Sequence, residues 1–219
     1  MRRWSPVAAV IAVALCLAYW LGASTAATVA RIDGDRLGPD SGERVQVYLQ
    51  HAAASLAAAP SAERRWALIS PTAQWSTDEV WRRLGDAPGV DRIGRVLVRV
   101  SVPGVQTPTV TLSPGQSAEG LGAVNELAAL AVPNLVAPGE RGAAIARVSE
   151  SRLRAGVPAV VGVVVHGTGD ALRAVSTQAG VRAVQVLPDD GGRFALAPLL
   201  PSFTDRAEPA ADDGPVPVA

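Results

Sequence analysis

The chain of 219 residues has no lysine, a single cysteine and only two histidines. One cysteine cannot form a disulfide or a cysteine-based zinc site within the chain. Two histidines without clustered carboxylates give no set of side chains that suits a metal ion. The lysine-bearing phosphate loop of nucleotide-binding proteins is excluded because no lysine exists. We therefore expect no metal and no cofactor.

The charges of the chain exclude one class of partner. Twenty basic and twenty acidic residues cancel, and the formal net charge at pH 7 is zero. Binding of nucleic acid requires a basic surface, so we do not expect nucleic acid as a partner. All the basic residues are arginine, which we interpret as the bias of a GC-rich genome. Hydrophobic residues make up 48% of the chain and charged residues 18%, a composition that supports a folded core.

The longest apolar stretch lies at the N-terminus. Residues 4–30 carry no charge and are mostly apolar. A helix needs about 20 such residues to cross the hydrocarbon layer of a membrane. Trp4 at one end, and Tyr19 and Trp20 near the other, suit the two membrane interfaces. We predict that residues 1–30 form a single transmembrane helix that anchors the protein.

The only cysteine of the chain lies inside this apolar stretch. A lipoprotein signal needs a small residue before its cysteine, and Leu15 precedes Cys16. We therefore interpret Cys16 as an ordinary apolar residue of the membrane helix.

The arginines around the stretch bear on its orientation. A short N-terminal segment that carries Arg2 and Arg3 favours a cytoplasmic N-terminus. The arginines that follow the stretch slightly outnumber those that precede it, which favours the opposite orientation. We predict a single-pass protein of the cell membrane with its N-terminus in the cytoplasm and its body outside. The alternative is a cleaved signal peptide, with Ser24 and Ala26 at the cleavage site and a secreted body.

Composition divides the chain into four parts. The anchor, or signal peptide, covers residues 1–30. A linker rich in glycine, aspartate and proline covers residues 31–43. Residues 44–201 form the extracytoplasmic domain. Residues 202–219 are acidic and rich in proline, and we expect this tail to be disordered.

Hydrophobic periodicity predicts both helices and strands in the domain. Helices are expected at residues 45–60, 76–85, 117–131 and 139–155. Strands are expected at residues 65–70 and 92–102, with an edge strand at 109–112. Residues 160–190 contain an apolar run, a Gly-x-Gly turn, an amphipathic stretch and a second apolar run. The turn sequence PDDGGR predicts a hairpin between strands at 184–187 and 194–196.

Two strand–helix–strand units resemble each other at an offset of 91 residues. The helix at 77–84 aligns with residues 168–175, and Gly89-Val90 aligns with Gly180-Val181. Two such units in one sheet give the ferredoxin-like, or split βαβ, arrangement. We predict an α+β fold with a ferredoxin-like sheet of two βαβ-like halves, a helical insertion between the halves, and one transmembrane helix before them.

The sequence His166-Gly-Thr-Gly-Asp170 resembles a dinucleotide-binding turn. A strand precedes it, a helix follows it, and Asp189 and Asp190 stand about twenty residues further on. However, Leu172 occupies the place of the third glycine, which close packing of helix and strand requires. The two aspartates also belong to the expected hairpin turn. We therefore expect no nucleotide at this turn.

His166 is the one candidate catalytic residue. A histidine at the end of a strand, near Thr168 and Asp170, has the chemistry of a general base. The simpler interpretation is that the histidine binds its own loop, while Thr168 and Asp170 cap the next helix. His51 is expected to face solvent from its helix. Three tryptophans near the first strand and helix are expected to pack in the core: Trp66, Trp75 and Trp81.

These observations favour a membrane-anchored, extracytoplasmic domain without catalysis that binds a ligand or acts as a sensor. The expected partners are the membrane, through the N-terminal helix, and another protein of the cell envelope. Two alternatives stay open. One is an extracytoplasmic enzyme that uses His166, and the other is an accessory subunit of an envelope transport or division complex.

Overall fold

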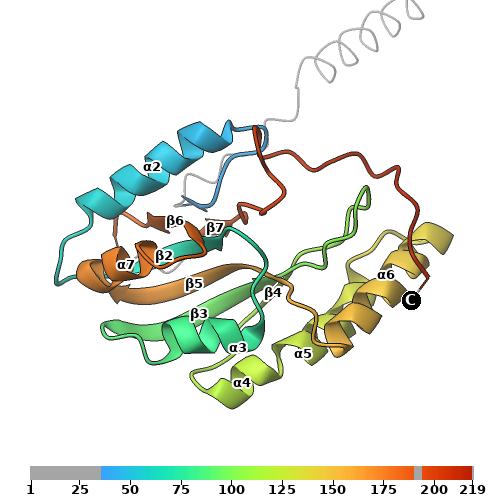
Figure 1. The fold of residues 1–219 in the computed structure, drawn as a ribbon, viewed down its shortest axis with the longest axis horizontal. Helices are drawn as coiled ribbons and strands as arrows, with labels where there is room; N and C mark the ends of the chain where they lie inside the picture. Colours follow the sequence, from blue (N-terminus) through green and yellow to red (C-terminus); the bar gives the residue numbers. More distant parts are fainter. Residues whose placement is uncertain (1–35, 190–193, 219) are drawn as a thin grey trace, which may run out of the picture. The chain divides into compact units, whose positions relative to one another are not determined.

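A five-stranded antiparallel sheet forms the centre of the computed structural model, which describes residues 36–189 and 194–218 (Figure 1). The strand order across the sheet is β4-β3-β5-β2-β6. The structure confirms the predicted α+β class. The strands are β2 (Arg64–Pro71), β3 (Val90–Val98), β4 (Val110–Leu112), β5 (Val160–Thr168) and β6 (Val181–Val186).

The predicted membrane anchor lies outside the described residues. Trp4, Cys16, Tyr19 and Trp20 all belong to it, and residues 31–35 of the predicted linker lie outside as well. Among the residues that the structure describes, no helix is long and apolar enough to span a membrane. The anchor and its orientation therefore stay predictions from the sequence.

Strand β5 lies at the centre of the sheet, between β3 and β2. Its sequence is VVGVVVHGT, and its first six residues are all buried. Valine is branched at Cβ and favours the extended backbone of a strand. A strand with protein on both faces is apolar throughout instead of alternating. This explains why the sequence shows a continuous apolar run here.

Helices α3 (Thr77–Val80), η1 (Trp81–Gly85) and α7 (Gly169–Ser176) cover one face of the sheet, toward the viewer in Figure 1. The N-terminal ends of α3 and α7 are capped by side chains. The Ser76 hydroxyl accepts a hydrogen bond from the amide of Glu79 at 3.1 Å, and the Thr168 hydroxyl accepts one from Ala171 at 3.3 Å. The main hydrophobic core lies between these helices and the sheet, and its helical members include Val80, Leu84, Leu172 and Val175.

A helical insertion separates β4 from β5 and extends the same core. Residues 117–131, expected as one helix, form α4 (Ala118–Gly122) and α5 (Val124–Ala131). Glycine is a poor helix former, and Gly120 and Gly122 explain the break between them. A short turn, η2 (Val132–Asn134), and α6 (Glu140–Arg154) complete the insertion.

The opposite face of the sheet is covered by short strands and the end of the chain. Strand β7 (Ala195–Leu196) pairs in parallel with β1 (Arg36–Leu37). The prediction of a hairpin between β6 and β7 was therefore wrong. After β6 the chain crosses to this face, where apolar residues of β1, the sheet and the chain end form a second core. Its buried members are Leu37, Leu68, Leu97, Val161, Val164, Leu187 and Leu200.

Helix α2 (Val45–Ala58) shields the β6 edge of the sheet. An edge strand exposes unpaired backbone groups, which proteins commonly cover with a helix or a loop. Here the Ser55 hydroxyl accepts a hydrogen bond from the amide of Val186 at 3.0 Å. Val45, Tyr48 and Ala52 form the buried stripe of the helix, as the periodicity predicts.

The end of the chain follows a defined path over the domain. We call residues 197–214 the C-terminal strap. The Asp205 carbonyl accepts a hydrogen bond from the amide of Val45 at 2.8 Å. Further on, Arg141 of α6 forms an ion pair with Asp212 at 2.7 Å. The strap thus runs from the start of α2 to α6 (Figure 1), although its composition predicts disorder after Pro201.

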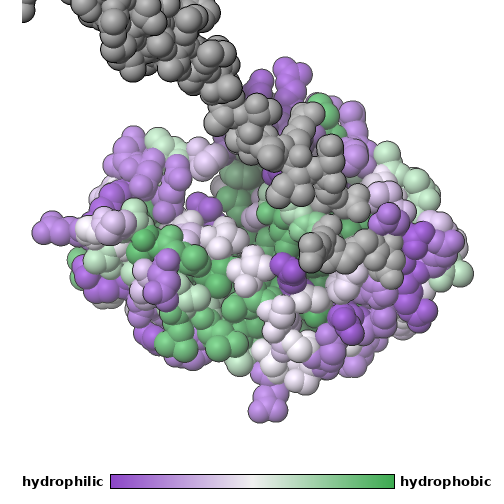
Figure 2. Space-filling model, turned by 180° about the vertical axis from the view of Figure 1, so that it is seen from behind, coloured by the Kyte–Doolittle hydropathy of each residue, from purple (hydrophilic) through white to green (hydrophobic). Residues whose placement is uncertain are grey.

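Hydrophobic residues reach the surface in several places, and Figure 2 shows some of them on the face that lies behind the view of Figure 1. Three leucines of the helical insertion are also exposed. Leu127, Leu130 and Leu135, on α5 and just after η2, are 46%, 58% and 52% exposed. Exposed leucines are ordinary on protein surfaces. These three residues are therefore not by themselves evidence of a binding site.

Candidate functional site

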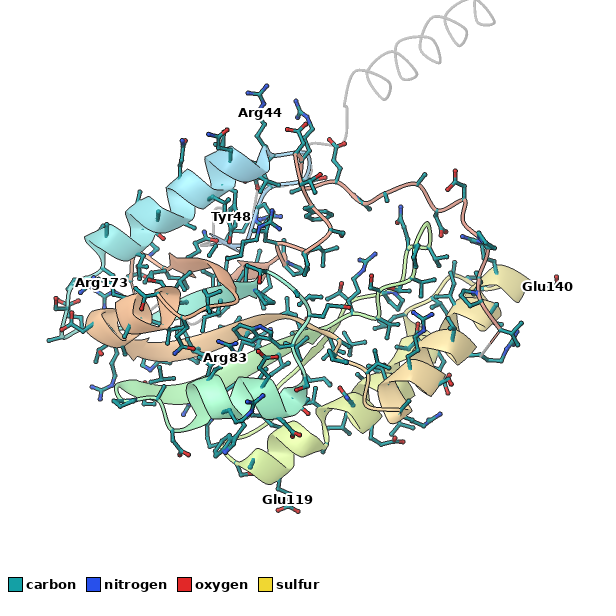
Figure 3. The ribbon with its side chains drawn as sticks, viewed as in Figure 1. Arg44, Tyr48, Arg83, Glu119, Glu140 and Arg173 are labelled. Carbon is teal, nitrogen blue, oxygen red and sulfur yellow. The ribbon has the colours of Figure 1, made fainter. Side chains whose placement is uncertain are left out.

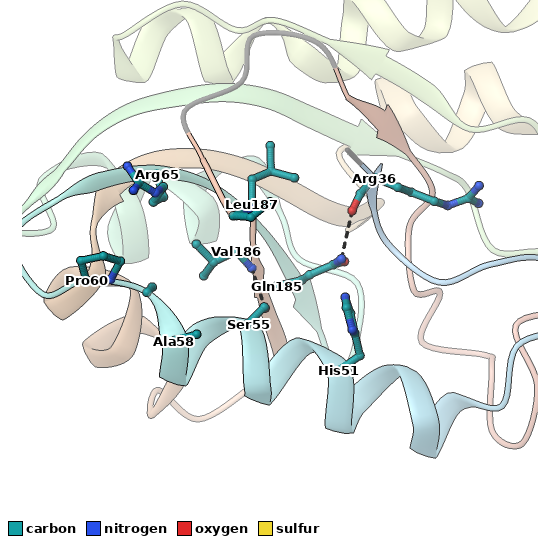
Figure 4. Close-up of a pocket in the computed structure, with 11 residues that line it drawn as sticks. Arg36, His51, Ser55, Ala58, Pro60, Arg65, Gln185, Val186 and Leu187 are labelled. Atoms are coloured by element: carbon teal, nitrogen blue, oxygen red, sulfur yellow. Dashed lines mark hydrogen bonds between the residues drawn. The ribbon is translucent and has the colours of Figure 1, made fainter. Parts of the chain in front are cut away.

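A pocket of about 510 Å³ opens between α2 and the end of β6 (Figure 4). We call it the α2–β6 pocket. Its size falls within the range of about 300–1,000 Å³ that small-molecule sites usually have. Its apolar lining residues are Ala58, Ala59, Pro60, Val186, Leu187 and Pro188, and its polar ones are Arg36, His51, Ser55, Arg65 and Gln185.

The walls of the pocket are held by hydrogen bonds between separate elements. Arg173 of α7 donates to the carbonyls of Leu56 at 3.2 Å and Ala59 at 2.9 Å (Figure 3). Both carbonyls lie at the C-terminal end of α2, where helix carbonyls lack their usual partners, and that of Leu56 also accepts the amide of Ala59 at 3.3 Å. The Ser55 bond to the Val186 amide joins the same end of α2 to β6. The pocket is therefore formed by the fold itself.

Gln185 is the buried polar residue of β6, and both the oxygen and the nitrogen of its side-chain amide form hydrogen bonds within the fold. Its Oε1 accepts hydrogen bonds from the amide of Gly38 at 2.6 Å and the hydroxyl of Tyr48 at 3.1 Å. Its Nε2 donates to the carbonyl of Arg36 at 3.0 Å. Burial raises the pKa of Tyr48 to about 12, so the phenol stays protonated at neutral pH and donates to Gln185. Gln185 thus builds the wall of the pocket, and its Oε1 is fully engaged by these bonds.

Arg65 carries an unused donor in the wall of the pocket. Its guanidinium forms an ion pair with Glu63 and donates to the carbonyl of Arg64 at 3.0 Å. Its Nε is buried and has no hydrogen-bond partner among the residues that the structure describes. A buried donor without an acceptor costs about 1–3 kcal/mol. An acceptor oxygen on a ligand would remove that cost once the Arg65 side chain turned its Nε toward the pocket.

The other basic groups of the pocket differ in orientation. Arg36 points away from the pocket interior (Figure 4), since its guanidinium donates to the carbonyl of Pro39 at 3.0 Å and pairs with Asp40 at 3.5 Å. His51 is exposed on α2, as predicted, and also lines the pocket. The polar groups that remain for a ligand are therefore His51 and Nε of Arg65, within walls that are otherwise apolar.

His166 lies beside Asp91, on the face of the sheet that carries Trp66 and the second core. Its Nδ1 is 3.0 Å from Oδ2 of Asp91, and its ring centre is 4.8 Å from that of Trp66. Asp91 also lies 3.6 Å from Nε of Arg64. Sequence reasoning missed Asp91, which is 75 positions from His166 and lies at a shift in register between β3 and β5. No pattern in the sequence indicates this contact.

The residues expected beside His166 have other partners. Thr168 caps α7, and Asp170 forms an ion pair with Arg173 at 2.9 Å. Hydrogen bonds from Arg173, and then from Ser61, hold the pKa of Asp170 below its ordinary value. His166 therefore has an orienting carboxylate in Asp91, but Thr168 and Asp170 belong to the helix and its contacts.

The turn after His166 uses its amides within the fold. The amides of Thr168, Gly169 and Asp170 donate to the carbonyls of Gly89, Glu63 and Ser61 at 2.9, 3.2 and 3.1 Å. A phosphate-binding turn would instead direct such amides toward its ligand. The glycines have a packing role, because a Cβ at Gly169 would overlap the carbonyl oxygen of Pro60.

The two aspartates of the expected hairpin turn are described only in part. Asp189 follows β6, and Asp190 lies outside the described residues. Within residues 36–189 and 194–218, no group of three or more histidine, cysteine, aspartate or glutamate side chains is placed to hold a metal ion.

The three tryptophans pack against hydrophobic cores, as expected, but not all against the same one. Trp75 is buried in the main core, where the Arg83 guanidinium lies 4.8 Å from its ring centre. Trp81 packs against the same core. Trp66 packs on the opposite face, against the second core. The alternation of side chains along β2 directs Trp66 away from the other two.

Comparison of the chain with protein-family models, with curated protein sequences and with solved structures finds no match. The proposed function therefore depends on the geometry of this chain alone.

Proposed function

We propose that this protein is a single-pass, membrane-anchored binding domain exposed outside the cytoplasm, and that the α2–β6 pocket is its ligand site. The ligand class is a small, largely apolar molecule with an acceptor oxygen. The observation that carries the proposal is the pocket of about 510 Å³, with its apolar walls and the buried, unpaired Nε of Arg65.

The location rests on the sequence. Residues 4–30 are uncharged and mostly apolar, and two arginines precede them. The cleaved signal peptide is the alternative, and both place the body outside the cytoplasm. Protease protection on intact cells tests the side, and N-terminal sequencing of the mature protein tests cleavage.

We infer a ferredoxin-like arrangement for the sheet. Strands β2 and β3 flank β5 and are joined through α3 and η1, while β5 and β6 flank β2 and are joined through α7. This is the order that two interleaved βαβ units give. The turns before β3 and β6 support the repeat, because Gly89 and Gly180 have φ values of +82° and +89°. Strand β4 and helices α4 to α6 are the insertion.

The character of the pocket favours a binding function over a catalytic one. Its polar groups are few, and the fold already uses Gln185 and Ser55. A largely apolar pocket with a few placed polar groups is the usual form of a small-molecule site. Arg65 and His51 would fix the orientation of a ligand, and the apolar walls would supply the affinity.

The binding test uses 2-naphthoate, an apolar ring system with an acceptor carboxylate, as the probe. The full chain in neutral detergent micelles is titrated and followed by ligand-observed NMR. Ala58→Trp fills the pocket from an exposed position of α2, so we expect it to abolish saturable binding without unfolding the domain. Ala54→Trp is the matched control, since Ala54 is exposed on α2 and does not line the pocket. Equal binding by the two variants contradicts the proposal.

A catalytic role for His166 is the second candidate function. Its specific support is the Asp91 carboxylate 3.0 Å from Nδ1, a contact that orients a histidine ring for proton transfer. An enzyme of this kind would lose its activity in His166→Ala while keeping its thermal stability. A sharp loss of stability instead identifies His166 as structural.

A further inference from the structure

Arg99 is a charged residue whose side chain has no partner in the part of the chain that the structure describes. It follows β3, and its neighbours Val98 and Val100 are both buried in the main core. Because side chains alternate along an extended chain, Arg99 lies on the opposite side, with Leu97. Leu97 and Leu200 both belong to the second core, so the guanidinium lies under the C-terminal strap.

Other arginines of comparable burial have partners. Arg83 pairs with Glu79 at 2.8 Å, Arg173 pairs with Asp170 at 2.9 Å, and Arg182 donates to the carbonyls of the strap. Among the arginines within residues 36–189 and 194–218, Arg99 alone is partly buried without a hydrogen bond or ion pair from its side chain. Burial lowers the pKa of its guanidinium, and no carboxylate offsets this effect. The positive charge is therefore uncompensated.

Three hollows of about 140, 230 and 200 Å³ meet at Arg99 and Leu200. The hollow of about 200 Å³ also contains Asp40, a carboxylate that disfavours an anion. The hollow of about 230 Å³ combines Arg99 with the hydroxyl-bearing residues Thr72, Ser101 and Ser202. None of its lining residues in the described part of the chain is an aspartate or glutamate. Its chemistry is that of an anion site.

The strap that covers this hollow is held in place by another arginine. Arg182 of β6 donates to the carbonyl of Leu200 at 3.2 Å and to that of Phe203 at 2.6 Å. These bonds fix residues 200–203 beside Arg99. On the other side, the side-chain amide of Gln74 donates to the carbonyl of Arg99 at 2.5 Å and holds its backbone. The hollow is thus bounded by anchored segments.

The Thr72 hydroxyl donates its proton to the carbonyl of Gly180 at 3.3 Å, so the hydroxyl donors that remain in this hollow are those of Ser101 and Ser202. We propose that Arg99 and these two hydroxyls, in the hollow beneath the strap, bind a phosphate group. A guanidinium offers two parallel N–H donors that match an oxyanion, and hydroxyls supply further donors. A bound phosphate would compensate the charge that the fold leaves unpaired. This site is separate from the α2–β6 pocket and does not depend on a ligand there. The phosphate belongs either to a free solute or to a phospholipid headgroup.

The test uses the full chain in neutral detergent micelles, with inorganic phosphate as the probe. Thermal unfolding and isothermal titration are measured against sodium chloride of equal ionic strength. The wild type is expected to show a saturable rise in Tm with phosphate. Arg99→Gln should lower the affinity at least about tenfold, since hydrogen bonds to charged groups dominate such a site. Arg99→Lys keeps the charge but loses the paired N–H donors, so its affinity for phosphate should lie between that of the wild type and that of Arg99→Gln.

The matched control is Arg147→Gln, which removes the same charge from an exposed position on α6 outside the hollow. It should bind phosphate as the wild type does. Equal phosphate responses in the wild type and Arg99→Gln, or no response in the wild type, overturn the proposal. A second arm repeats the titration in phosphatidylcholine nanodiscs with and without phosphatidylglycerol. Loss of the response to free phosphate when phosphatidylglycerol is present identifies the headgroup as the source, and an unchanged response identifies a free solute.

Discussion

The hydroxyl of Tyr48 lies 3.1 Å from Oε1 of Gln185, and this contact joins α2 to the edge strand β6. The same oxygen accepts the amide of Gly38, and the amide nitrogen of Gln185 donates to the carbonyl of Arg36. One buried side chain therefore connects a helix, the five-stranded sheet and β1. It also forms part of the wall of the α2–β6 pocket.

Replacing Gln185 by leucine should destabilise the protein. The change leaves the Gly38 amide and the Tyr48 hydroxyl without their acceptor in a site that is 5% exposed. We expect the free energy of unfolding to fall by roughly 2–4 kcal/mol, as measured by denaturant titration. Gln50→Leu, at an exposed position of α2, is the control and should change it little. Equal effects of the two changes would show that the Gln185 network is not what holds α2 to the sheet.

The stability of the protein should fall at high pH because of Tyr48. Burial raises its pKa to about 12, whereas an unfolded chain has a tyrosine pKa of about 10. The neutral phenol therefore contributes stability below pH 10, and that contribution is lost as the pH rises from about 10 to about 12. The expected loss is about 2–3 kcal/mol. Denaturant titrations between pH 8 and pH 12 should show a steeper decline for the wild type than for Tyr48→Phe. Parallel curves would place the tyrosine pKa near its ordinary value.

Removing the arginine that holds the end of the strap should release it. Arg141 donates to Asp212 at 2.7 Å and to the carbonyl of Gly214 at 3.0 Å. Its hydrogen bond also holds the pKa of Asp212 below its ordinary value. In Arg141→Ala, we expect faster hydrogen–deuterium exchange at Gly214, whose amide donates to the carbonyl of Gly104, and an unchanged rate in β5. Arg147→Ala is the control, and exchange at Gly214 that is equally fast in both variants would refute the role of the ion pair.

The local patterns of the sequence predicted much of the fold. The buried stripe of α2, the caps Ser76 and Thr168, and the valine run of β5 each follow from the chain around them. The failures involve contacts between distant segments. The turn after β6 carries a hairpin signal, yet β7 pairs with β1 because the second core lies on the other face. The composition of the strap is acidic and rich in proline, which predicts disorder. Several of the residues that hold it lie about 70 to 160 positions away in the sequence, so no local pattern indicates them.

The candidate site was less predictable than the fold. Gln185 gave a signal, since a polar residue in a buried strand needs partners. Its partners on α2 and β1 could not be named from the sequence. His166 was identified as a candidate, but the contact with Asp91 arises from the register of β3 against β5. Arg99 fits the alternation of side chains along its strand, and no pattern in the sequence indicates that its side chain will lack a partner.

The burial and packing of His166 favour a structural role for this residue over a catalytic one. The His166 side chain is 15% exposed, lies against Trp66 and binds Asp91. His166→Ala should lower the free energy of unfolding by about 1–2 kcal/mol, through lost packing and a lost charge-assisted hydrogen bond. Denaturant titration measures this, with His51→Ala as the exposed control. Unchanged stability in His166→Ala would instead favour the catalytic alternative.

The two glycines of the internal repeat should differ in how they tolerate a side chain. Gly89 and Gly180 both have positive φ, which costs about 1–2 kcal/mol for alanine. A Cβ at Gly89 would also lie 2.9 Å from Cβ of Ala171, whereas at Gly180 its nearest neighbour is the flexible Arg83 side chain at 3.3 Å. We expect Gly89→Ala to lower the free energy of unfolding by roughly 2–4 kcal/mol, and Gly180→Ala by about 1–2 kcal/mol.

Gly115→Ala provides the reference for backbone strain alone, because Gly115 has a φ of +77° and no atom within 4 Å of an added Cβ. Denaturant titration of the three variants separates strain from overlap. If Gly89→Ala costs no more than Gly115→Ala, helix α7 can move away from the turn. The packing of the first half of the repeat against the second would then be looser than the structure indicates.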